Sequence, residues 1–391
     1  MPRYRVLNDH RRRPVLRRPT RRGIPTGRRR PLRSPDPLGG AATLPRLLDS
    51  LRLLEGQVFE LVVVVAWTHG GLAEAAERWV RELLAAWRAP EGVTARLAGA
   101  ALGEGIAAAT GTDRGTVADL LDPTHYSGVR NRCLAAAVLL DADSLVLLDD
   151  DEALRDEDLL DALTAPLADG WDGNAGLYME DGERVVVPVE PTAATLHFDA
   201  NGPRLAAFEA LLDGGRPVAA PFAFGGNLAL SPRLFRHLPF DPIVPRGEDV
   251  DYVLSARLRG HCMQLDPAIR VDHFAPRKRA APWRQLWIDG WRFLAQRRKL
   301  ACAASAGGPP LDLDPYPGRV LTGDLGERLA RALAALGAPP VAMARLGEWE
   351  RELEGRDPWA AYGELVDVWL ETTDGLRGKD ADGWLPRVEG R

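Results

Sequence analysis

The feature that most restricts what this chain can fold into is an apolar run over residues 58–67 (VFELVVVVAW), in which β-branched residues follow one another almost without a break. A strand that is buried on both faces needs such a run, and strands of this kind belong to parallel sheets covered by helices. Residues 71–89 then place apolar side chains at helical spacing, namely Leu72, Ala76, Trp79, Val80 and Leu83. The two segments form a strand-helix unit, which indicates an α/β fold with a mostly parallel sheet.

A second helix and strand end in acidic residues. Residues 129–140 are rich in alanine and leucine and are expected to form a helix, and residues 144–148 (SLVLL) are expected to form a buried strand. Asp149, Asp150 and Asp151 follow directly, at the carboxyl end of that strand. Ligands of open α/β sheets bind at this edge, because the loops that leave the strands form a crevice there.

Length and composition indicate an ordinary globular protein. With 391 residues and a hydrophobic content of 46%, the chain can bury the core of a large α/β domain and of a smaller additional part. It has no uninterrupted apolar run of about 18 residues and no signal-peptide core, so we expect a cytoplasmic protein. Cys133, Cys262 and Cys302 are far apart and lack CxxC spacing, which argues against a disulfide framework and against a zinc site.

The first 40 residues differ from the rest of the chain. Residues 1–36 hold 13 Arg against Asp9 and Asp36, although the whole chain has a net charge of −5. The segment is rich in Arg, Pro and Gly and lacks apolar periodicity, so we expect residues 1–40 to be a disordered tail. Its charge would attract nucleic acid or anionic lipid without specificity. A dispensable chain start explains it better, and we expect no specific nucleic-acid partner.

Asp149 and Asp151 are the candidate metal ligands. In an extended strand, side chains two positions apart face the same side, so these two carboxylates should converge while Asp150 faces away. Carboxylate oxygens suit Mg²⁺ or Mn²⁺, which complete their shells with phosphate oxygens and water. The alternative is a solvated acidic turn that binds no ion.

A second acidic cluster and a histidine lie further along the chain. Glu248 and Asp249 open an expected helix over residues 248–259, where carboxylates also interact favourably with the helix dipole, so helix capping is an alternative to a catalytic role. Residues 269–273 (IRVDH) have the pattern of a strand that ends in His273. Its imidazole could bind a metal ion or hydrogen-bond a loop, and a structural role is the simpler interpretation of this histidine taken alone.

Four motifs occur together and in a fixed order: GVRNRCLAAAVLLDADSLVLLDDDEAL, FAFGGNLALSPRLF, RGEDVDYVLSARLRG and VDHFAP. In these motifs the chain resembles the inverting glycosyltransferases of family two and their relatives, over about residues 58–275. The resemblance implies a GT-A domain at residues 41–300, which is a Rossmann-like, mostly parallel central sheet flanked by helices. It also implies metal-dependent transfer of a sugar from a nucleotide-diphosphate sugar donor to a hydroxyl acceptor.

The resemblance further assigns the donor side of the site. Asp149 and Asp151 would hold Mn²⁺ or Mg²⁺, and through it the donor diphosphate, with His273 as a third ligand. Asp150, or Asp149 in a shifted register, would face the ribose. The other expected donor contacts are Thr68, Arg130, Asn131, Gly225 and Gly226. For the two glycines, a tight turn before the next strand is an equally good explanation.

On the acceptor side, the resemblance makes Asp249 the general base, which would take a proton from the acceptor hydroxyl as it attacks the anomeric carbon. Glu248 would orient the acceptor. The chain departs from the family pattern in two places. Its first apolar strand ends in residues 66–69 (AWTH) without the usual proline, which leaves the nucleotide base open. It also lacks the Arg/Trp signature of processive synthases, so we expect non-processive transfer. Retention of configuration stays open beside inversion.

Residues 301–391 are expected to form a helical appendage, with helical segments over residues 325–336, 341–353 and 360–371. Before them, Trp283, Trp287 and Trp291 are spaced by four on an expected helix that also carries basic residues, namely Arg284, Arg292, Arg297, Arg298 and Lys299. Three interpretations of this helix remain: packing against the catalytic domain, a peripheral membrane contact through residues 283–299, and a wall that binds the acceptor.

Two other function classes are consistent with parts of the sequence. A sugar-nucleotide nucleotidyltransferase would also use a carboxylate-held metal, but it normally needs a basic Gly-rich loop, and no Lys or Arg follows residues 68–71 (THGG) before Arg78. A non-catalytic glycosyltransferase-like binding protein would not need every acidic motif. The sugar, the acceptor, which loops such as residues 190–220 would select, and the oligomeric state cannot be read from the sequence.

Overall fold

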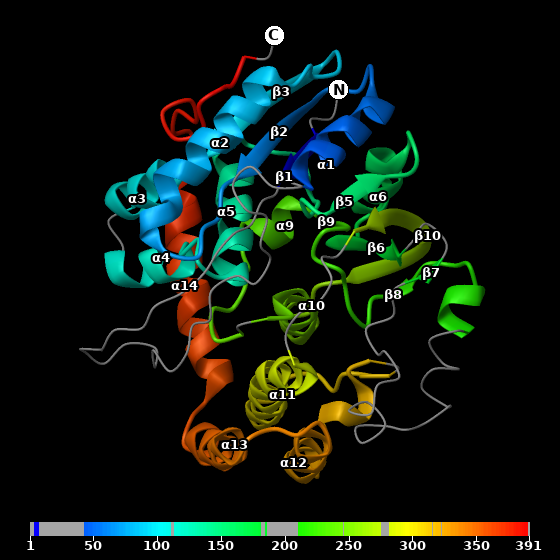
Figure 1. Ribbon diagram of the computed structural model, residues 1–391, viewed down its shortest axis with the longest axis vertical. Helices are drawn as coiled ribbons and strands as arrows, with labels where there is room; N and C mark the ends of the chain where they lie inside the picture. Colours follow the sequence, from blue (N-terminus) through cyan, green and yellow to red (C-terminus); the bar gives the residue numbers. More distant parts are fainter. Residues whose placement is uncertain are drawn as a thin grey trace.

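The computed structural model describes residues 4–7, 43–110, 113–180, 184–185, 210–244, 246–274, 281–314, 316–321 and 323–389. It is a mixed α/β structure in which one sheet is covered by helices on both faces (Figure 1). The segment that was expected to contain the acceptor loops lies largely outside the described residues, as does most of the Arg-rich tail.

The sheet has the strand order β3-β2-β1-β4-β9-β6-β10-β5, with the short strands β7 and β8 paired to β6 and β10. The strands are β1 (Tyr4–Leu7), β2 (Phe59–Val64), β3 (Val93–Ala98), β4 (Leu145–Leu147), β5 (Glu152–Leu154), β6 (Gly173–Glu180), β7 (Arg184–Val185), β8 (Val218–Ala219), β9 (Leu228–Leu230) and β10 (Met263–His273). The apolar run at residues 58–67 is therefore a strand, as its composition predicts.

The sheet is parallel in one half and mixed in the other. Strands β3, β2, β1 and β4 are parallel to one another, whereas β9 is antiparallel to both β4 and β6. β10 is parallel to β6 and antiparallel to β5. The expectation of a mostly parallel sheet thus holds only for the half that begins at β3. The antiparallel strands β9 and β5 pair with strands that are distant in the sequence and not with those to which short loops join them.

Strand β1 lies inside the segment that was expected to be a disordered tail. Tyr4–Leu7 pair with both β2 and β4, so they occupy an interior position of the sheet. The expectation does not hold for these four residues. The segment YRVL contains two residues that favour strands, Tyr4 and Val6, and it pairs with β2 along its length and with β4 at Val6 and Leu7.

Helices cover the two faces of the sheet with two separate apolar layers. They are α1 (Leu44–Ser50), α2 (Ala73–Ala86), α3 (Ala100–Ala109), α4 (Arg114–Leu120), α5 (Tyr126–Leu139), α6 (Leu159–Ala168), α9 (Pro232–Phe235) and α10 (Glu248–Leu258), with 3₁₀ turns at Leu51–Leu54, Gly70–Leu72 and Gly318–Leu321. Along β2, Leu61 and Val63 face the layer of α1, α2 and α6, whereas Val62 and Val64 face the layer of α3, α4 and α5. The strand is therefore apolar on both faces from Leu61 to Val64.

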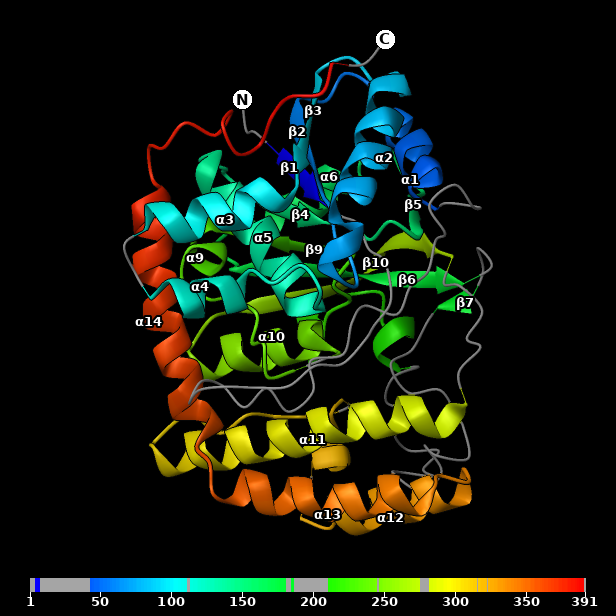
Figure 2. The same cartoon turned by 60° about the vertical axis from the view of Figure 1, so that its left-hand side comes forward.

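Four further helices follow: α11 (Pro282–Ser305), α12 (Leu325–Ala335), α13 (Pro340–Glu354) and α14 (Pro358–Leu376). The last three match the helical segments expected from the sequence. In Figure 2, α11 lies between α10 and the pair α12 and α13, and α14 returns along the side of the molecule to α3 and α4. The chain then continues to the edge strand β3, where Leu97 N–H donates to Pro386 O and Val388 N–H donates to Ala95 O.

The tryptophan stripe of α11 packs inside the protein. Trp287 and Trp291 both contact Trp349 of α13, with ring centroids 4.6 and 5.4 Å apart. Their indole N–H groups donate to Ala342 O and to Ile243 O. Packing is therefore the interpretation that the structure supports, and these two rings do not form a membrane-facing surface. Among the described residues, no helix is both long enough and apolar enough to cross a membrane.

Candidate functional site

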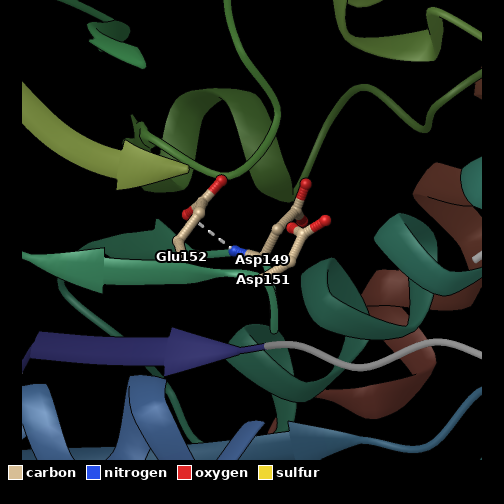
Figure 3. Close-up of side chains that lie close together, drawn as sticks. All are labelled: Asp149, Asp151 and Glu152. Carbon is tan, nitrogen blue, oxygen red and sulfur yellow. Dashed lines mark hydrogen bonds between the residues drawn. The ribbon is translucent and has the colours of Figure 1, made fainter. Parts of the chain in front are cut away.

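The acidic triplet lies in a tight turn between β4 and β5. Glu152 N–H donates to Asp149 O at 3.1 Å, so the chain turns immediately after β4 and does not continue as an extended strand. Ligand atoms of Asp149, Asp151 and Glu152 lie within 4.8 Å of one another. Figure 3 shows the carboxylates of Asp149 and Asp151 side by side. The expected convergence of these two residues is present, but it is produced by the turn and not by strand alternation.

Glu152 belongs to this cluster, although the sequence argument did not select it. Its Oε2 accepts a hydrogen bond from Asp149 N–H at 2.8 Å, and its side chain is fully buried. Burial and the neighbouring charge of Asp149 raise the pKa of the Glu152 carboxyl well above its usual value. Three carboxylates held this close repel one another, and a divalent cation would relieve that repulsion, so the residues present fit a hard-cation site.

Asp150 faces the opposite side of the turn. The Oδ2 atom of Asp150 accepts a hydrogen bond from Thr43 Oγ1 at 3.0 Å, and the Asp150 side chain is buried. Thr43 is the residue before α1. Asp150 therefore points away from Asp149 and Asp151, as strand alternation had suggested. The contact that was expected between Asp150 and a ribose would have to come from the side of α1. Asp149 is the aspartate that faces the rest of the site.

Arg130 connects the two acidic motifs. Its Nη2 donates to Asp149 Oδ1 at 2.7 Å, and its Nε lies 3.7 Å from Glu248 Oε1. The guanidinium is buried, and the carboxylates of Asp149 and Glu248 raise its pKa against the opposing effect of burial. Residues about 100 positions apart in the sequence, in the β4–β5 turn and at the start of α10, therefore share one buried cation and one site.

Glu248 and Asp249 form the first turn of α10, after Gly247 in the left-handed backbone region. Asp249 Oδ2 accepts from Gly225 N–H at 3.0 Å. Burial raises the pKa of both carboxyls, and the nearby charges of Asp249 and Arg130 act on Glu248 in opposite directions, which leaves its pKa at about 7. A buried carboxylate with a raised pKa is a better proton acceptor near neutral pH than an ordinary aspartate.

Gly225 and Gly226 lie where side chains would not fit. A Cβ atom on Gly225 would be 2.5 Å from Arg130 Nη2, and one on Gly226 would be 2.0 Å from Glu152 Oε1. Neither glycine has a positive φ, so the requirement is for space and not for a special backbone conformation. The sequence selected both residues, and the structure places them against the acidic turn and the start of α10.

Tyr178 of β6 is a further site residue that the sequence did not indicate. Its hydroxyl accepts from Gly226 N–H at 2.7 Å and donates to Asp149 Oδ2 at 3.4 Å. Its ring stacks between Phe224 and His273, with centroid distances of 4.3 and 4.6 Å. The stacking places His273 Nε2 3.8 Å from Asp151 Oδ1, which brings His273 to the acidic cluster as expected. A tyrosine inside an apolar strand gives no local signal of this role.

Two of the expected donor-binding residues, Asn131 and Thr68, have buried side chains. The amide of Asn131 donates to Leu120 O and Phe240 O and accepts from Phe240 N–H, and the side chain is fully buried, so Asn131 joins α5 to the end of α4 and to the loop at Phe240. Thr68 follows β2, which is separated from β4 by β1, and its side chain is also buried. The residues that the structure brings together are Arg130, Asp149, Asp151, Glu152, Tyr178, Gly225, Gly226, Glu248, Asp249 and His273.

No protein-family model and no curated protein matches the sequence. Among solved structures, the chain is similar to the mannosyltransferase PcManGT from Pyrobaculum calidifontis in complex with GDP-Man and Mn²⁺, with 15% sequence identity and a TM-score of 0.44 over 95% of this chain and 86% of that chain. It is also similar to a mycobacterial protein of known crystal structure, with 16% identity and a TM-score of 0.37 over 79% of this chain and 76% of that chain.

Proposed function

We propose that this protein is a metal-dependent glycosyltransferase with a GT-A domain of the family-two type. It would move a sugar from a nucleotide-diphosphate sugar to a hydroxyl acceptor, with inversion and without processive polymerisation. The observation that carries the proposal is the bridge that Arg130 makes between Asp149 and Glu248. It joins a cluster suited to a cation and diphosphate to a pair of buried carboxyls suited to proton transfer.

Asp149, Asp151 and His273 would hold Mn²⁺ or Mg²⁺, with Glu152 close enough to contribute. The cation would supply Lewis-acid stabilisation of the departing nucleoside diphosphate. Arg130 keeps the Asp149 carboxylate oriented, and the hydroxyl of Tyr178 adds a second fixed contact to the same carboxylate. Gly225 and Gly226 let their backbone lie directly against Arg130 and Glu152, so the segment that contacts Asp249 packs onto the acidic turn.

Asp249 would act as the general base. The N–H groups of Gly225 and Val250 donate to its two carboxylate oxygens at 3.0 and 2.7 Å, which fixes the carboxylate while further lone pairs remain for an acceptor hydroxyl. The raised pKa of Asp249 favours removal of the acceptor proton as the hydroxyl attacks the anomeric carbon. Glu248, held near Arg130, would orient the acceptor.

The test is a transfer and binding assay with the full chain. Purified protein is screened against UDP-, GDP- and dTDP-sugars with Mn²⁺ or Mg²⁺, with nucleoside diphosphate release and thermal shift as readouts. We expect Asp249→Asn to lower the transfer rate about 10²- to 10⁴-fold while metal-dependent nucleotide binding is kept. Asp151→Asn should weaken that binding about 10-fold or more. Asp156→Asn, an exposed acidic residue five positions further on, is the matched control and should behave as wild type.

Three results would contradict the proposal. The first is no binding or turnover of any nucleotide sugar by the wild type with either metal. The second is release of pyrophosphate in place of a nucleoside diphosphate, which would indicate a nucleotidyltransferase. The third is metal-dependent nucleotide binding that Asp151→Asn leaves unchanged. Proton NMR of the anomeric signal in the first product distinguishes inversion from retention.

A further inference from the structure

Helix α11 contacts the segment that carries Glu248 and Asp249 at several points. The two helices α10 and α11 lie next to each other in both views of the molecule (Figures 1 and 2). Trp291 Nε1 donates to Ile243 O at 2.9 Å, and Lys299 Nζ lies 2.7 Å from Asp251 Oδ2. These two contacts lie five residues before Glu248 and three residues after it, so α11 contacts the chain on both sides of the acidic motif.

Arg292 of α11 packs directly against Gly247, the residue before the motif. A Cβ atom on Gly247 would lie 2.5 Å from Arg292 Nη1, 2.7 Å from Cζ and 2.8 Å from Nε, so the guanidinium lies against the backbone there. Gly247 also has φ of 70°, a conformation that other residues adopt with strain. Glycine at this position satisfies both requirements, and the chain can turn into α10 over the face of Arg292.

A second arginine ties the same turn to α11. Arg246 donates from Nη1 to both carboxylate oxygens of Asp289, at 3.0 and 2.9 Å. With its amide oxygen turned toward Arg246, Gln285 accepts from Nη1 and Nη2 at 2.8 and 3.0 Å. Arg292 Nη2 lies 3.7 Å from the same Asp289. Asp289 therefore contacts both arginines, Arg246 in the turn before α10 and Arg292 on α11.

The arginines also set the charge around Asp249. The charged groups that act on Glu248 and Asp249 are Asp149 of the β4–β5 turn, Arg130 of α5, Arg246 of the preceding loop and Arg292 of α11, and the two carboxyls also act on each other. Burial raises the pKa of Asp249, and the cations Arg130 and Arg292 lower it. Of these two, Arg130 contacts Asp149 as well, whereas Arg292 lies on the α11 side and contacts Tyr316 Oη at 3.3 Å.

We propose that Arg292, supported by Asp289 and Arg246, is a positioning residue for Asp249: it holds the Gly247 turn and places a positive charge near the base. This inference rests on the proposed function, because it takes Asp249 to be the base. The inference gives helix α11 a part in sugar transfer. Arg292 would act through Asp249, without contact with either substrate.

The test compares Arg292→Gln with Arg292→Lys, which keeps the charge, and with Arg298→Met as the matched control. Arg298 leaves the same helix on another side and donates to the carbonyls of Arg356 and Glu354. For Arg292→Gln we expect the acid limb of the kcat/KM profile to move up by about one pH unit, because an opposite charge that lowered the pKa of the base is gone. The kcat should fall about 10-fold or more with the donor KM little changed.

Arg292→Lys should return the acid limb to within a few tenths of a unit of wild type, and Arg298→Met should leave both quantities unchanged. An unshifted acid limb in Arg292→Gln would overturn the inference, as would a loss of activity that appears only in the donor KM. Should Arg292→Gln fail to fold, Arg246→Gln tests the same turn at a partly exposed position and should shift the limb in the same direction.

Failure of the proposed function is separable from failure of this inference. If the wild type transfers no sugar, the proposed function fails. Hydrogen exchange at the Gly225 amide then tests whether Arg292 positions Asp249, because this measurement does not depend on activity. That amide donates to Asp249 Oδ2. Its exchange should be faster in Arg292→Gln than in wild type and Arg298→Met if Arg292 holds Asp249 in place, and equal exchange in all three would overturn the inference.

Discussion

Glu248 shows how a single buried carboxyl can link the candidate site to the stability of the fold. The residue is 5% exposed, and burial together with Asp249 raises its pKa to about 7 from an ordinary value of about 4.5. A raised folded-state pKa means that the folded chain binds the proton more tightly than the unfolded chain does. The resulting stability is therefore present in full below about pH 4.5 and is lost as the pH rises through about 7.

Glu248→Gln should remove this pH dependence, because the amide does not ionise. We expect the free energy of unfolding of wild type to fall between pH 5 and pH 8 more steeply than that of the variant, with a difference on the order of 2 to 3 kcal/mol. Urea denaturation at several pH values measures it. Parallel curves for the two proteins would show that Glu248 titrates normally in the folded state.

The sequence identifies the acidic residues of the site better than it identifies their partners. Asp149, Asp151, Glu248 and Asp249 stand out because charged residues directly after an apolar strand or at a helix start are chemically conspicuous. Tyr178 and Arg292 do not, since the site residues that they contact, Asp149 and Gly247, are 29 and 45 positions away in the sequence. Such contacts are set by how strands and helices meet, which local pattern does not encode.

At the level of secondary structure elements, long periodic segments were predictable and short or unusual ones were not. The helices α12, α13 and α14 and the strand β2 follow from spacing and composition. Strand β1 has only the four residues Tyr4–Leu7 and lies in an Arg-rich context, so its composition predicts disorder. Pairing with two neighbouring strands supplies the stabilising contacts, and those neighbours are more than 50 residues away in the sequence.

The last residues of the chain protect the edge of the sheet at β3. Leu97 N–H and Ala95 O are both paired with the C-terminal segment, and Arg96, 3% exposed, donates to Glu60, Asp382 and Leu385 O. An uncovered edge strand offers unpaired backbone groups to other molecules. The C-terminal segment thus keeps this edge from pairing between chains.

Ending the chain after Arg377 should therefore destabilise the protein and promote association. The edge of β3 would be open, and buried Arg96 would keep Glu60 as its carboxylate partner but lose Asp382. We expect a melting temperature lower by several degrees, from a loss of about 2 kcal/mol or more, and concentration-dependent light scattering. Asp382→Asn is the control and should have a much smaller effect, because this side chain is 58% exposed. A truncated protein as stable and monodisperse as wild type would contradict the assigned role of the segment.

At the scale of the whole molecule, the C-terminal helices share their core with the layer that covers the sheet. One apolar cluster includes Val62 and Leu147 of the sheet, Leu294 of α11, Trp349 of α13 and Trp369 of α14. Trp369 Nε1 also donates to Phe235 O of α9, so α14 is joined to the sheet layer by polar contacts as well. The sequence predicts the helices but not this continuity, because a helix's apolar face does not specify its partner. We therefore expect one cooperative unfolding transition for the described structure.

A substitution of Lys299 tests whether α11 and the sheet layer unfold cooperatively. Its Nζ lies 2.8 Å from Asp241 and 2.7 Å from Asp251, and all three side chains are at most 4% exposed. Lys299→Met would leave two buried carboxylates without their cation, which should lower the free energy of unfolding by about 3 to 5 kcal/mol.

The size of that loss should depend on pH with a definite sign. Burial already raises the pKa of Asp241 and Lys299 lowers it, so the variant's folded state would bind a proton there more tightly. Its stability would be retained at low pH and lost as the pH rises, and the defect should be larger at pH 8 than at pH 5. Denaturation followed by tryptophan fluorescence and by far-UV circular dichroism measures it, with Arg298→Met, a neighbouring cation that contacts only backbone carbonyls in the hydrogen bonds described, as the control. Two separate transitions in wild type, or a defect that shrinks as the pH rises, would show that the helices and the sheet layer do not unfold as one unit through this contact.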